Sequence, residues 1–316
     1  DIKEALEFVQ KNNIQKVFIL GLGSNLIFTD DYFDGAVIQI TNGVIPEAIG
    51  DPEVDSRLRG NDKKGFRLRS KNNISINDEG LVNAFAGEVL DDVIKFSFEN
   101  NLTGLEWAGG LPGTVGAAVR GNVGAFGGEI KDSIEKVDLI DYSIGSSVLK
   151  TLTNQELEFV YRGSIVKTQK KMVVVNAYFS LKKANQEEIE KASEVYNKNK
   201  HFRRDHHPLE YPNCGSVFKN IRDREKVEKV LSVYPDLKES VEKKWYGKVA
   251  VASLIEKLGL KGFRIGNAQI SEKHALFIVN LGGATNNDVR QIIDKVQLKF
   301  HNTFGFGLEV EVEIVN

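Results

Sequence analysis

Apolar residues fall into short segments of two kinds along the chain. At the start, Ile2, Ala5, Leu6 and Val9 recur at helical spacing, with acidic residues early and Lys11 late, which predicts a helix over residues 1–12. The charged segment 187–199 is also expected to be helical, as are residues 90–100, 249–258 and 286–302. Short apolar or alternating runs predict strands over residues 16–20, 35–40, 74–76, 81–86, 136–142, 147–149, 172–181, 274–280 and 308–315. Strands and helices of this kind predict an α+β fold.

Residues 104–132 interrupt this pattern with nine glycines between Gly104 and Gly128. A flexible linker would be poor in apolar residues, whereas this stretch also contains Leu, Trp, Val, Ala and Phe. It therefore indicates an ordered, tightly turning loop. Exposed backbone N–H groups in such turns, together with a helix start, form anion sites. The stretch predicts a loop that holds a pyrophosphate or a flat cofactor ring, although composition alone also allows a tight connection within a core.

A second glycine-rich turn, residues 21–26, directly follows the apolar run 17–20. Its Gly21-x-Gly23 pattern resembles part of a dinucleotide fingerprint. No third glycine opens a helix, however, and no crossover helix follows, which excludes the Rossmann interpretation. Ser24 and Asn25 remain suitable donors for phosphate or ribose oxygens.

An ordered set of motifs then identifies a family. LGLGSNLIFTD at 20–30 and AGGLPGTVGAAVRGNVGAFGGE at 108–129 resemble the two flavin-binding segments of UDP-N-acetylmuramate dehydrogenases. The resemblance continues through YRGS at 161–164, LEYPNCGSVFKN at 209–220 and LGLKGFRIGNAQISEKHALFIVN at 258–280. It implies a two-part FAD-binding region, similar to that of the vanillyl-alcohol oxidases, followed by a C-terminal α+β substrate-binding domain.

Three domains are expected from the resemblance. They are FAD-binding subdomain 1 at 1–77, FAD-binding subdomain 2 at 78–198 and a substrate-binding domain at 199–316, with residues 199–207 as a polar linker. The residues implied to bind FAD are Gly21, Leu22, Gly23, Ser24, Asn25, Leu26, Gly110, Pro112, Gly113, Thr114, Gly116, Asn122, Gly124, Ala125 and Phe126.

The implied reaction is reduction of an enolpyruvyl double bond on a nucleotide sugar, with electrons passing from NADPH through FAD. By resemblance, Arg162 binds the carboxylate and stabilises developing charge, Ser216 donates the proton, and Glu311 assists protonation. Glu309, Glu311 and Glu313 share one face of an alternating strand, so periodicity cannot choose among them. Without the resemblance, a surface ion pair is the more frequent explanation for such an arginine, and a turn serine that bonds to the backbone is the preferred one for Ser216. An exposed acidic strand face is the alternative for Glu311.

Four further residues are implied to contact the nucleotide sugar: Tyr161, Lys219, Asn220 and His274. The five histidines of the chain show no spacing typical of a zinc site, so no metal is expected. Cys214 is expected to be a small packed side chain rather than a nucleophile.

Composition narrows the functional class further. A chain of 316 residues can contain two or three domains, and its net charge of −2 gives no sign of a nucleic-acid partner. No apolar run reaches the roughly eighteen residues that span a bilayer. The single cysteine excludes an intramolecular disulfide and is typical of a reducing cytoplasm. We expect a cytoplasmic monomer.

Two regions depart from the family pattern. The family has a further strand region with a Thr-x-x-x-Gly-Gly-like element ahead of the first helix. We expect this difference to affect flavin affinity. Residues 45–71 mix Pro, Gly and Asp with a basic run, which predicts an inserted surface loop or, alternatively, an anion-binding patch. An FAD-dependent oxidase of another small molecule and a non-catalytic paralogue that binds flavin or nucleotide sugar are the alternative functions.

Overall fold

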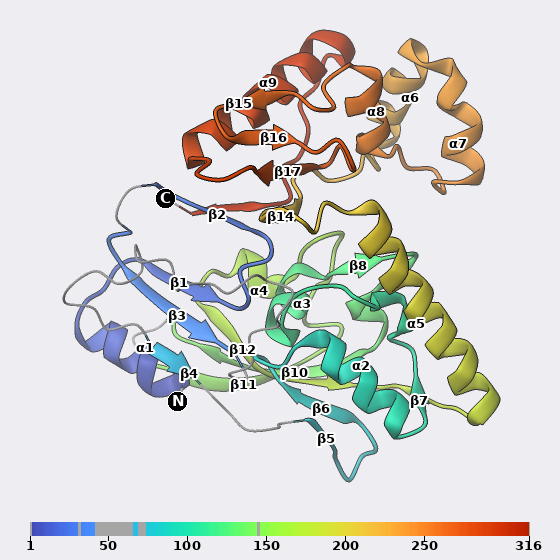
Figure 1. The fold of residues 1–316 in the computed structure, drawn as a ribbon. Helices are drawn as coiled ribbons and strands as arrows, with labels where there is room; N and C mark the ends of the chain where they lie inside the picture. Colours follow the sequence, from blue (N-terminus) through green and yellow to red (C-terminus); the bar gives the residue numbers. More distant parts are fainter. Residues whose placement is uncertain (1, 31–32, 42–65, 69–73, 144–145, 316) are drawn as a thin grey trace. The chain divides into compact units, whose positions relative to one another are not determined.

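The computed structural model describes residues 2–30, 33–41, 66–68, 74–143 and 146–315 (Figure 1). The chain forms two compact units, the first made of residues 1–23 and 34–203, the second of residues 24–33 and 204–316. The short segment 24–33 therefore belongs with the C-terminal part of the chain rather than with its neighbours in sequence. The three-domain division inferred from the sequence stays a prediction.

The first unit begins with α1 (Ile2–Lys11), and the four apolar residues that predicted this helix are all buried. Next to it, β1 (Val17–Leu20), β3 (Ala36–Ile40) and β4 (Phe66–Leu68) form a parallel sheet in the order β1-β3-β4. The prediction of an inserted surface loop over residues 45–71 is therefore wrong for residues 66–68, which form strand β4. The rest of that segment, 45–65 and 69–71, lies outside the described residues.

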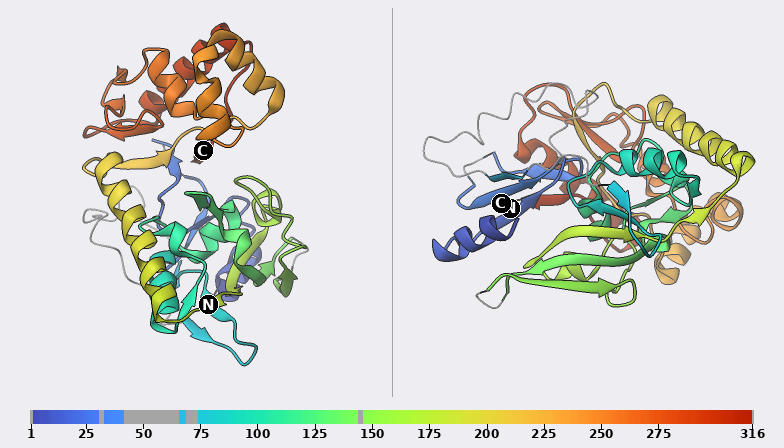
Figure 2. Two further views of the ribbon diagram at one scale, coloured as in Figure 1. Left: turned by 90° about the vertical axis from the view of Figure 1, so that its right-hand side faces the viewer. Right: turned by 90° about the horizontal axis from the view of Figure 1, so that it is seen from below.

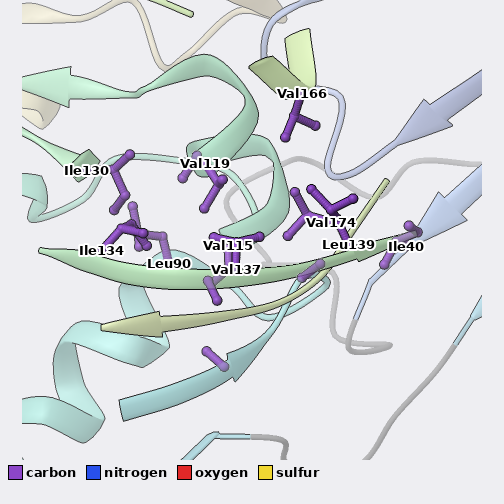
Figure 3. Packing of buried hydrophobic residues seen from close by; sticks show 14 of the residues in the cluster. Ile40, Leu90, Val115, Val119, Ile130, Ile134, Val137, Leu139, Val166 and Val174 are labelled. Carbon is purple, nitrogen blue, oxygen red and sulfur yellow. The ribbon is translucent and has the colours of Figure 1, made fainter. Parts of the chain in front are cut away.

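A second sheet of the first unit is antiparallel throughout, as predicted for residues 136–181. Its order is β11 (Val148–Thr153), β10 (Ile134–Asp141), β12 (Met172–Phe179), β6 (Val82–Phe85) and β5 (Ile74–Ile76). Helices α2 (Leu90–Glu99), α3 (Val115–Gly121) and α4 (Ile165–Thr168) belong to the same unit, and α3 and α4 both contact β12. Figure 3 shows Leu90 and Val115 with Val137 and Leu139 in this core.

The glycine-rich stretch is ordered, as predicted. It contains the 3₁₀ turn η2 (Glu106–Ala108), helix α3, the short strands β8 (Gly124–Ala125) and β9 (Gly128–Glu129), and a second 3₁₀ turn, η3 (Ile130–Asp132). Just before it, β7 (Leu102–Thr103) pairs with β13 (Lys182–Lys183).

Helix α5 (Gln186–His206) is longer than predicted and runs as one continuous helix (Figure 2). The expectation of a polar linker over 199–207 is therefore wrong for all but its last residue. No proline or glycine interrupts residues 186–207, and Pro208 is the first helix-breaking residue. The polar composition of 199–206 reflects an exposed helix surface, with Asn199 buried on the opposite face.

The second unit has a four-stranded antiparallel sheet in the order β14 (Asn213–Ser216), β17 (Phe277–Asn280), β16 (Ala268–Ile270) and β15 (Arg264–Ile265). Its core contains Leu254 from α8 (Val251–Lys257) and Ile292 and Phe300 from α9 (Asn286–Phe304). The remaining helical elements are α6 (Arg224–Val233), η4 (Pro235–Leu237) and α7 (Lys238–Lys243).

Segment 24–33 joins this unit by a strand pairing. β2 (Leu26–Phe28) lies parallel to β18 (Glu313–Val315), the end of the predicted closing strand. Beyond β2, the Asp30 carboxylate accepts hydrogen bonds from the backbone N–H groups of Asn286 (2.7 Å) and Asn287 (3.2 Å), at the start of α9. Among the described residues, no helix combines the length and apolarity that crossing a membrane requires.

Candidate functional site

The two glycine-rich segments meet in the first unit. A Cβ atom at Gly21 would lie 2.7 Å from the Thr114 Oγ1 atom, closer than real side chains approach. Thr114 is buried and caps α3, where its hydroxyl accepts the N–H of Ala117 at 3.4 Å. Any side chain at position 21 would therefore force the turn after β1 or Thr114 to shift, because the two are in direct contact at the start of α3.

The first N–H groups of α3 already have partners in the protein. The N–H of Val115 donates to the carbonyl of Glu88 at 2.9 Å, and the N–H of Gly116 donates to the carbonyl of Ala86 at 2.8 Å. A Cβ at Gly116 would lie only 2.9 Å from that of Ala86. An anion beside this helix would therefore be held largely by other donors.

Segment 110–113 before the helix is anchored by a charged side chain. Gly110 and Gly113 have positive φ values of 68° and 138°, with Pro112 just before Gly113. The N–H of Gly110 donates to the Asp91 carboxylate at 3.4 Å. Burial raises the pKa of Asp91, but hydrogen bonds, chiefly from Lys95 and Tyr196, outweigh this and hold it below its usual value. The carboxylate is therefore charged at neutral pH.

Asn122, a predicted cofactor residue, ties the end of α3 to the segment that carries Arg162. It is fully buried in the left-handed conformation at φ 40°. Its amide donates to the carbonyl of Val160 at 2.9 Å and to the carboxylate of Glu129 at 3.1 Å, while its oxygen accepts the N–H of Lys131 at 3.3 Å. These contacts give Asn122 a positioning role, and its contact with a cofactor stays a prediction.

Arg162 lies in a two-residue turn closed by reciprocal backbone hydrogen bonds between Val160 and Gly163 at 3.0 and 3.1 Å. Its φ of 60° is unfavourable for a residue with a side chain, which is a feature found at functional positions. The guanidinium donates to the Gly124 carbonyl at 2.7 Å and lies 5.0 Å from the Tyr161 ring centroid. The turn therefore fixes the cation beside β8.

The β8–β9 hairpin carries an exposed aromatic ring at its tip. Its two turn residues, Phe126 and Gly127, have φ values of 49° and 95°, as a tight hairpin requires. Phe126 is 49% exposed. In β9, a Cβ at Gly128 would lie 2.3 Å from the Trp107 ring, so this hairpin packs closely on η2. Gly124 and Ala125 form β8 itself.

In the second unit, Ser216 and Glu311 lie on neighbouring segments. The N–H of Glu311 donates to the carbonyl of Val217 at 2.8 Å, and the N–H of Lys219 donates to the carbonyl of Glu309 at 2.9 Å. Residues 309–311 therefore run antiparallel to 217–219. Ser216, the last residue of β14, directly precedes this pairing.

Ser24, Asn25 and Leu26 belong to this neighbourhood, whereas Gly21, Leu22 and Gly23 belong to the first unit. The Asn25 amide donates to the Glu311 carbonyl at 3.3 Å. A Cβ at Gly215, whose φ is 75°, would lie 3.8 Å from the Ser24 carbonyl oxygen. The second glycine turn thus contributes its polar residues to the unit that holds Ser216.

Lys219 and Asn220 have partners in the second unit. The Lys219 ammonium lies 3.0 Å from the Glu309 carboxylate, and its side chain is 20% exposed. The Asn220 side-chain oxygen accepts the N–H of Val251 at 3.1 Å, at the first residue of α8. Their predicted contacts with a diphosphate stay predictions.

His274 is a half-buried, neutral imidazole. Its ring centroid lies 5.4 Å from that of His207 and 5.0 Å from that of Phe277. Burial lowers its pKa, and its Nδ1 accepts the N–H of Leu276 at 3.3 Å. Of the four predicted substrate contacts, only Tyr161 lies in the first unit; His274, Lys219 and Asn220 lie in the second.

Arg203 adjoins the predicted cofactor residues, although the sequence did not single it out. Its Nε donates to the Gly109 carbonyl at 3.0 Å, and its guanidinium lies 5.0 Å from the Phe126 ring centroid. The sequence contains two adjacent arginines, 203 and 204, in a polar run, and nothing in the pattern distinguishes them.

One further side chain, Cys214, is defined by its burial. Cys214 is buried, and burial raises the pKa of its thiol to about 12, which supports the predicted packing role. Across the described ranges, no cluster of three or more histidine, cysteine, aspartate or glutamate side chains could hold a metal ion.

Comparisons with known proteins agree along nearly the whole chain. A profile of the C-terminal domain of UDP-N-acetylenolpyruvoylglucosamine reductase matches residues 207–315, and an FAD binding domain profile matches residues 60–148. The reductase of Anoxybacillus flavithermus is 36% identical over 99% of this chain and 84% of its own length. That of Thermotoga maritima is 36% identical over 94% of this chain and 83% of its own length.

A solved structure extends the comparison to the fold. The crystal structure of the reductase from Thermus caldophilus superposes with a TM-score of 0.64 at 25% identity, covering 98% of this chain and 90% of that one. The predicted α+β fold, with an FAD-binding region followed by a C-terminal domain, is confirmed by these matches.

Proposed function

The chain belongs to the UDP-N-acetylenolpyruvoylglucosamine reductase family, and we propose that it takes the electrons for its reaction from NADPH. It is a flavin-dependent oxidoreductase that reduces UDP-N-acetylglucosamine enolpyruvate to UDP-N-acetylmuramate in peptidoglycan precursor synthesis. The observation that carries this function is the match over nearly the whole chain. A monomer acting in the cytoplasm completes the proposal, and light scattering after size-exclusion chromatography tests its oligomeric state.

The residues of the first unit fit an FAD group. The turn at Gly21 lies against Thr114, and Gly110 and Gly113 of the neighbouring segment both have positive φ values, which bring its backbone into a tight turn. Beside it, the Nη2 atom of Arg203 is buried without a hydrogen-bond partner among the described residues, which suits an acceptor-rich ligand. When bound there, FAD supplies the redox chemistry, taking up two electrons and passing them to the enolpyruvyl double bond.

Arg162 is proposed to hold the substrate carboxylate. A guanidinium has five donors in a planar fork, and Gly124 accepts from one of its nitrogens. Reduction of the double bond places negative charge next to the carboxylate, so a cation fixed at this point stabilises the transition state more than the ground state. The strained turn at Arg162 restricts where that charge can lie.

Ser216 is proposed to donate the proton that completes the reduction at C2, and Glu311 is proposed to assist this transfer. A serine hydroxyl is a weak acid, so it needs a strongly basic acceptor and a nearby group that eases proton movement. The hydrogen bond between Glu311 and Val217 places Glu311 one residue from Ser216 along the paired segments. The Asn25 amide in turn donates to the Glu311 carbonyl.

One anaerobic titration tests the proposal. NADPH should bleach the oxidised-flavin spectrum of the purified protein, and the enolpyruvyl nucleotide sugar should restore it. Arg162→Ala and Glu311→Gln should bleach normally but recover colour far more slowly. Glu313→Gln, two residues along the same stretch, is the matched control and should recover at the wild-type rate.

Each alternative outcome has a distinct meaning. Bleaching without recovery would leave a flavoprotein whose substrate is another molecule, as in the oxidase alternative. Unchanged recovery in either variant would remove that residue from the mechanism. A protein that gains no visible spectrum with added FAD would contradict the flavin function altogether.

A further inference from the structure

A second cation holds the turn that carries Arg162. The Lys167 ammonium donates a hydrogen bond to the carbonyl oxygen of Arg162 at 3.0 Å. Lys167 lies on α4 and is half-buried, whereas Lys170 and Lys171, which follow it, are exposed. Nothing in the sequence separates Lys167 from these two lysines, and its contact with the Arg162 backbone is visible only in the fold.

Arg162 needs support because its backbone is in the left-handed region at φ 60°. A residue with a side chain keeps such a conformation only where the surrounding contacts specify it. The reciprocal backbone hydrogen bonds between Val160 and Gly163 close the turn, and the Asn122 amide fixes the Val160 carbonyl at 2.9 Å. The bond from Lys167 acts on the carbonyl of Arg162 itself. It therefore fixes the peptide group that joins Arg162 to Gly163.

Helix α4 gives Lys167 a firm base. Val166 is 3% exposed and lies in the core of the first unit (Figure 3), and α4 contacts both α3 and β12. The buried hydroxyl of Ser164, the residue before α4, donates to the carbonyl of Arg120 in α3 at 2.9 Å. A hydrogen bond from a charged donor is stronger than one between neutral groups. Lys167 thus ties the backbone of Arg162 to a packed part of the first unit.

We propose that Lys167 is a positioning residue that acts on substrate reduction through Arg162. The inference rests on the proposed function, because it takes Arg162 as the residue that holds the substrate carboxylate. The Arg162 guanidinium donates to the Gly124 carbonyl at 2.7 Å, so both ends of this residue are held by protein contacts. Without the ammonium of Lys167, the turn relaxes toward a favourable φ, and the guanidinium moves from the place where negative charge develops. A misplacement of about 1 Å is enough to slow a reaction by about a hundredfold.

The test follows one turnover of the bound flavin without air. The flavin is reduced with stoichiometric dithionite, and its reoxidation by the enolpyruvyl nucleotide sugar is recorded over a range of sugar concentrations, which separates the limiting rate from substrate affinity. Lys167→Met removes the ammonium but keeps an unbranched side chain, so it should lower the limiting rate about tenfold while FAD affinity stays at the wild-type value. Lys167→Arg keeps a charged donor and should recover most of this rate. Lys170→Met changes an exposed lysine of the same segment, so it is the matched control and should reoxidise at the wild-type rate.

A double-mutant cycle shows whether Lys167 acts through Arg162. Arg162→Ala has no guanidinium to misplace, so adding Lys167→Met to it should slow reoxidation by no more than about twofold. A lysine that binds the substrate directly, or that only supports the fold, would slow the reaction by the same factor in both backgrounds. That result overturns the proposal, and so does a Lys167→Met protein that reoxidises as fast as Lys170→Met.

Each remaining outcome also has a defined meaning. Should Lys167→Met fail to fold, Lys167→Asn keeps a polar side chain that is too short to reach the ammonium position, and it is expected to show the same dependence on Arg162. Wild-type reoxidation in Lys167→Asn overturns the proposal. An Arg162→Ala protein that reoxidises at the wild-type rate refutes the proposed role of Arg162 and the inference with it. A wild-type protein whose reduced flavin is not reoxidised by the sugar refutes the proposed function instead.

Discussion

Replacing Gly21 with alanine tests whether the two glycine-rich segments form one surface. The backbone of Gly21 does not have a positive φ, so alanine itself is not strained there. The new Cβ would lie 2.7 Å from Thr114 Oγ1 and 3.4 Å from Thr114 Cγ2. Thr114 cannot move aside without losing the cap of α3. The whole effect of the substitution therefore comes from one close contact.

The size of the effect follows from this geometry. Forcing one extra methyl group into a packed contact costs about 1–3 kcal/mol. For a unit of this size that corresponds to a fall in melting temperature of about 2–12 °C. If the turn moves away from α3 to relieve the contact, FAD affinity should fall by about five- to a hundredfold, since about 1.4 kcal/mol is tenfold.

Three further variants isolate the contact. Gly121 is the last residue of α3, the helix that Thr114 caps, and a Cβ there would have nothing within 4 Å. Gly121→Ala should therefore be neutral or stabilising by up to about 1 kcal/mol. Thr114→Ala alone should cost about 1 kcal/mol for the lost cap. In the double variant the two alanines no longer collide, so it should be more stable than the sum of the single changes by about 1–2 kcal/mol.

Thermal unfolding of apoprotein and fluorescence titration with FAD measure both quantities. Additive effects in the double variant would show that Gly21 and Thr114 are not in contact. A Gly21→Ala protein with the melting temperature and FAD affinity of Gly121→Ala would refute the close seating of the two segments.

Three other predictions follow from single contacts. Asn122→Gly keeps the backbone conformation but loses the hydrogen bond to Val160, so it should slow substrate reduction more than it weakens FAD binding. Equal losses in the rate of substrate reduction and in FAD affinity would contradict a positioning role. Hydrogen bonds from Lys150 and Ser143 lower the pKa of Asp141 to about 2. The stabilising contribution of this carboxylate is therefore present above about pH 4 and should be lost as the pH falls toward 2. In pH-dependent melting, Lys150→Met should reduce this sensitivity to acid. Asp30→Ala leaves two N–H groups at the start of α9 without their acceptor, so it should destabilise the second unit by about 1 kcal/mol. Asp30→Asn keeps an acceptor oxygen and should be less affected. An unchanged melting curve for Asp30→Ala would refute the assignment of segment 24–33 to that unit.

Local patterns predicted the elements whose packing is visible in the sequence. In α1 the apolar spacing named the same four residues that are buried. The alternation of β3 is also found in its burial, with Ala36, Ile38 and Ile40 facing the core. Periodicity succeeds here because one side of each element faces a core and the other does not.

Pairings between distant parts of the chain could not be read from the sequence in this way. Strands β2 and β18 pair although almost the whole chain separates them in sequence. The three apolar residues of β2 contain nothing that specifies β18 as their partner. Strand β4 is likewise defined by β3 beside it. The resemblance placed Ser216 and Glu311 in one site, but the backbone bond from Glu311 to Val217 that brings them together depends on tertiary structure.

The sequence did not single out Arg203, and it also did not predict the extension of α5 beyond residue 199 that carries this residue. Residues 199–206 have little apolar periodicity, because the hydrogen bonds of Asn199 and Arg203 go to backbone carbonyls of the loop. Its partner, Gly109, has no side chain that could leave a complementary pattern, and the close approach excludes any Cβ there. A helix that packs on a glycine loop through polar groups therefore resembles a linker in sequence. Wherever such a helix borders a ligand loop, its inward polar residues, here Asn199 and Arg203, are the first candidates for ligand contact.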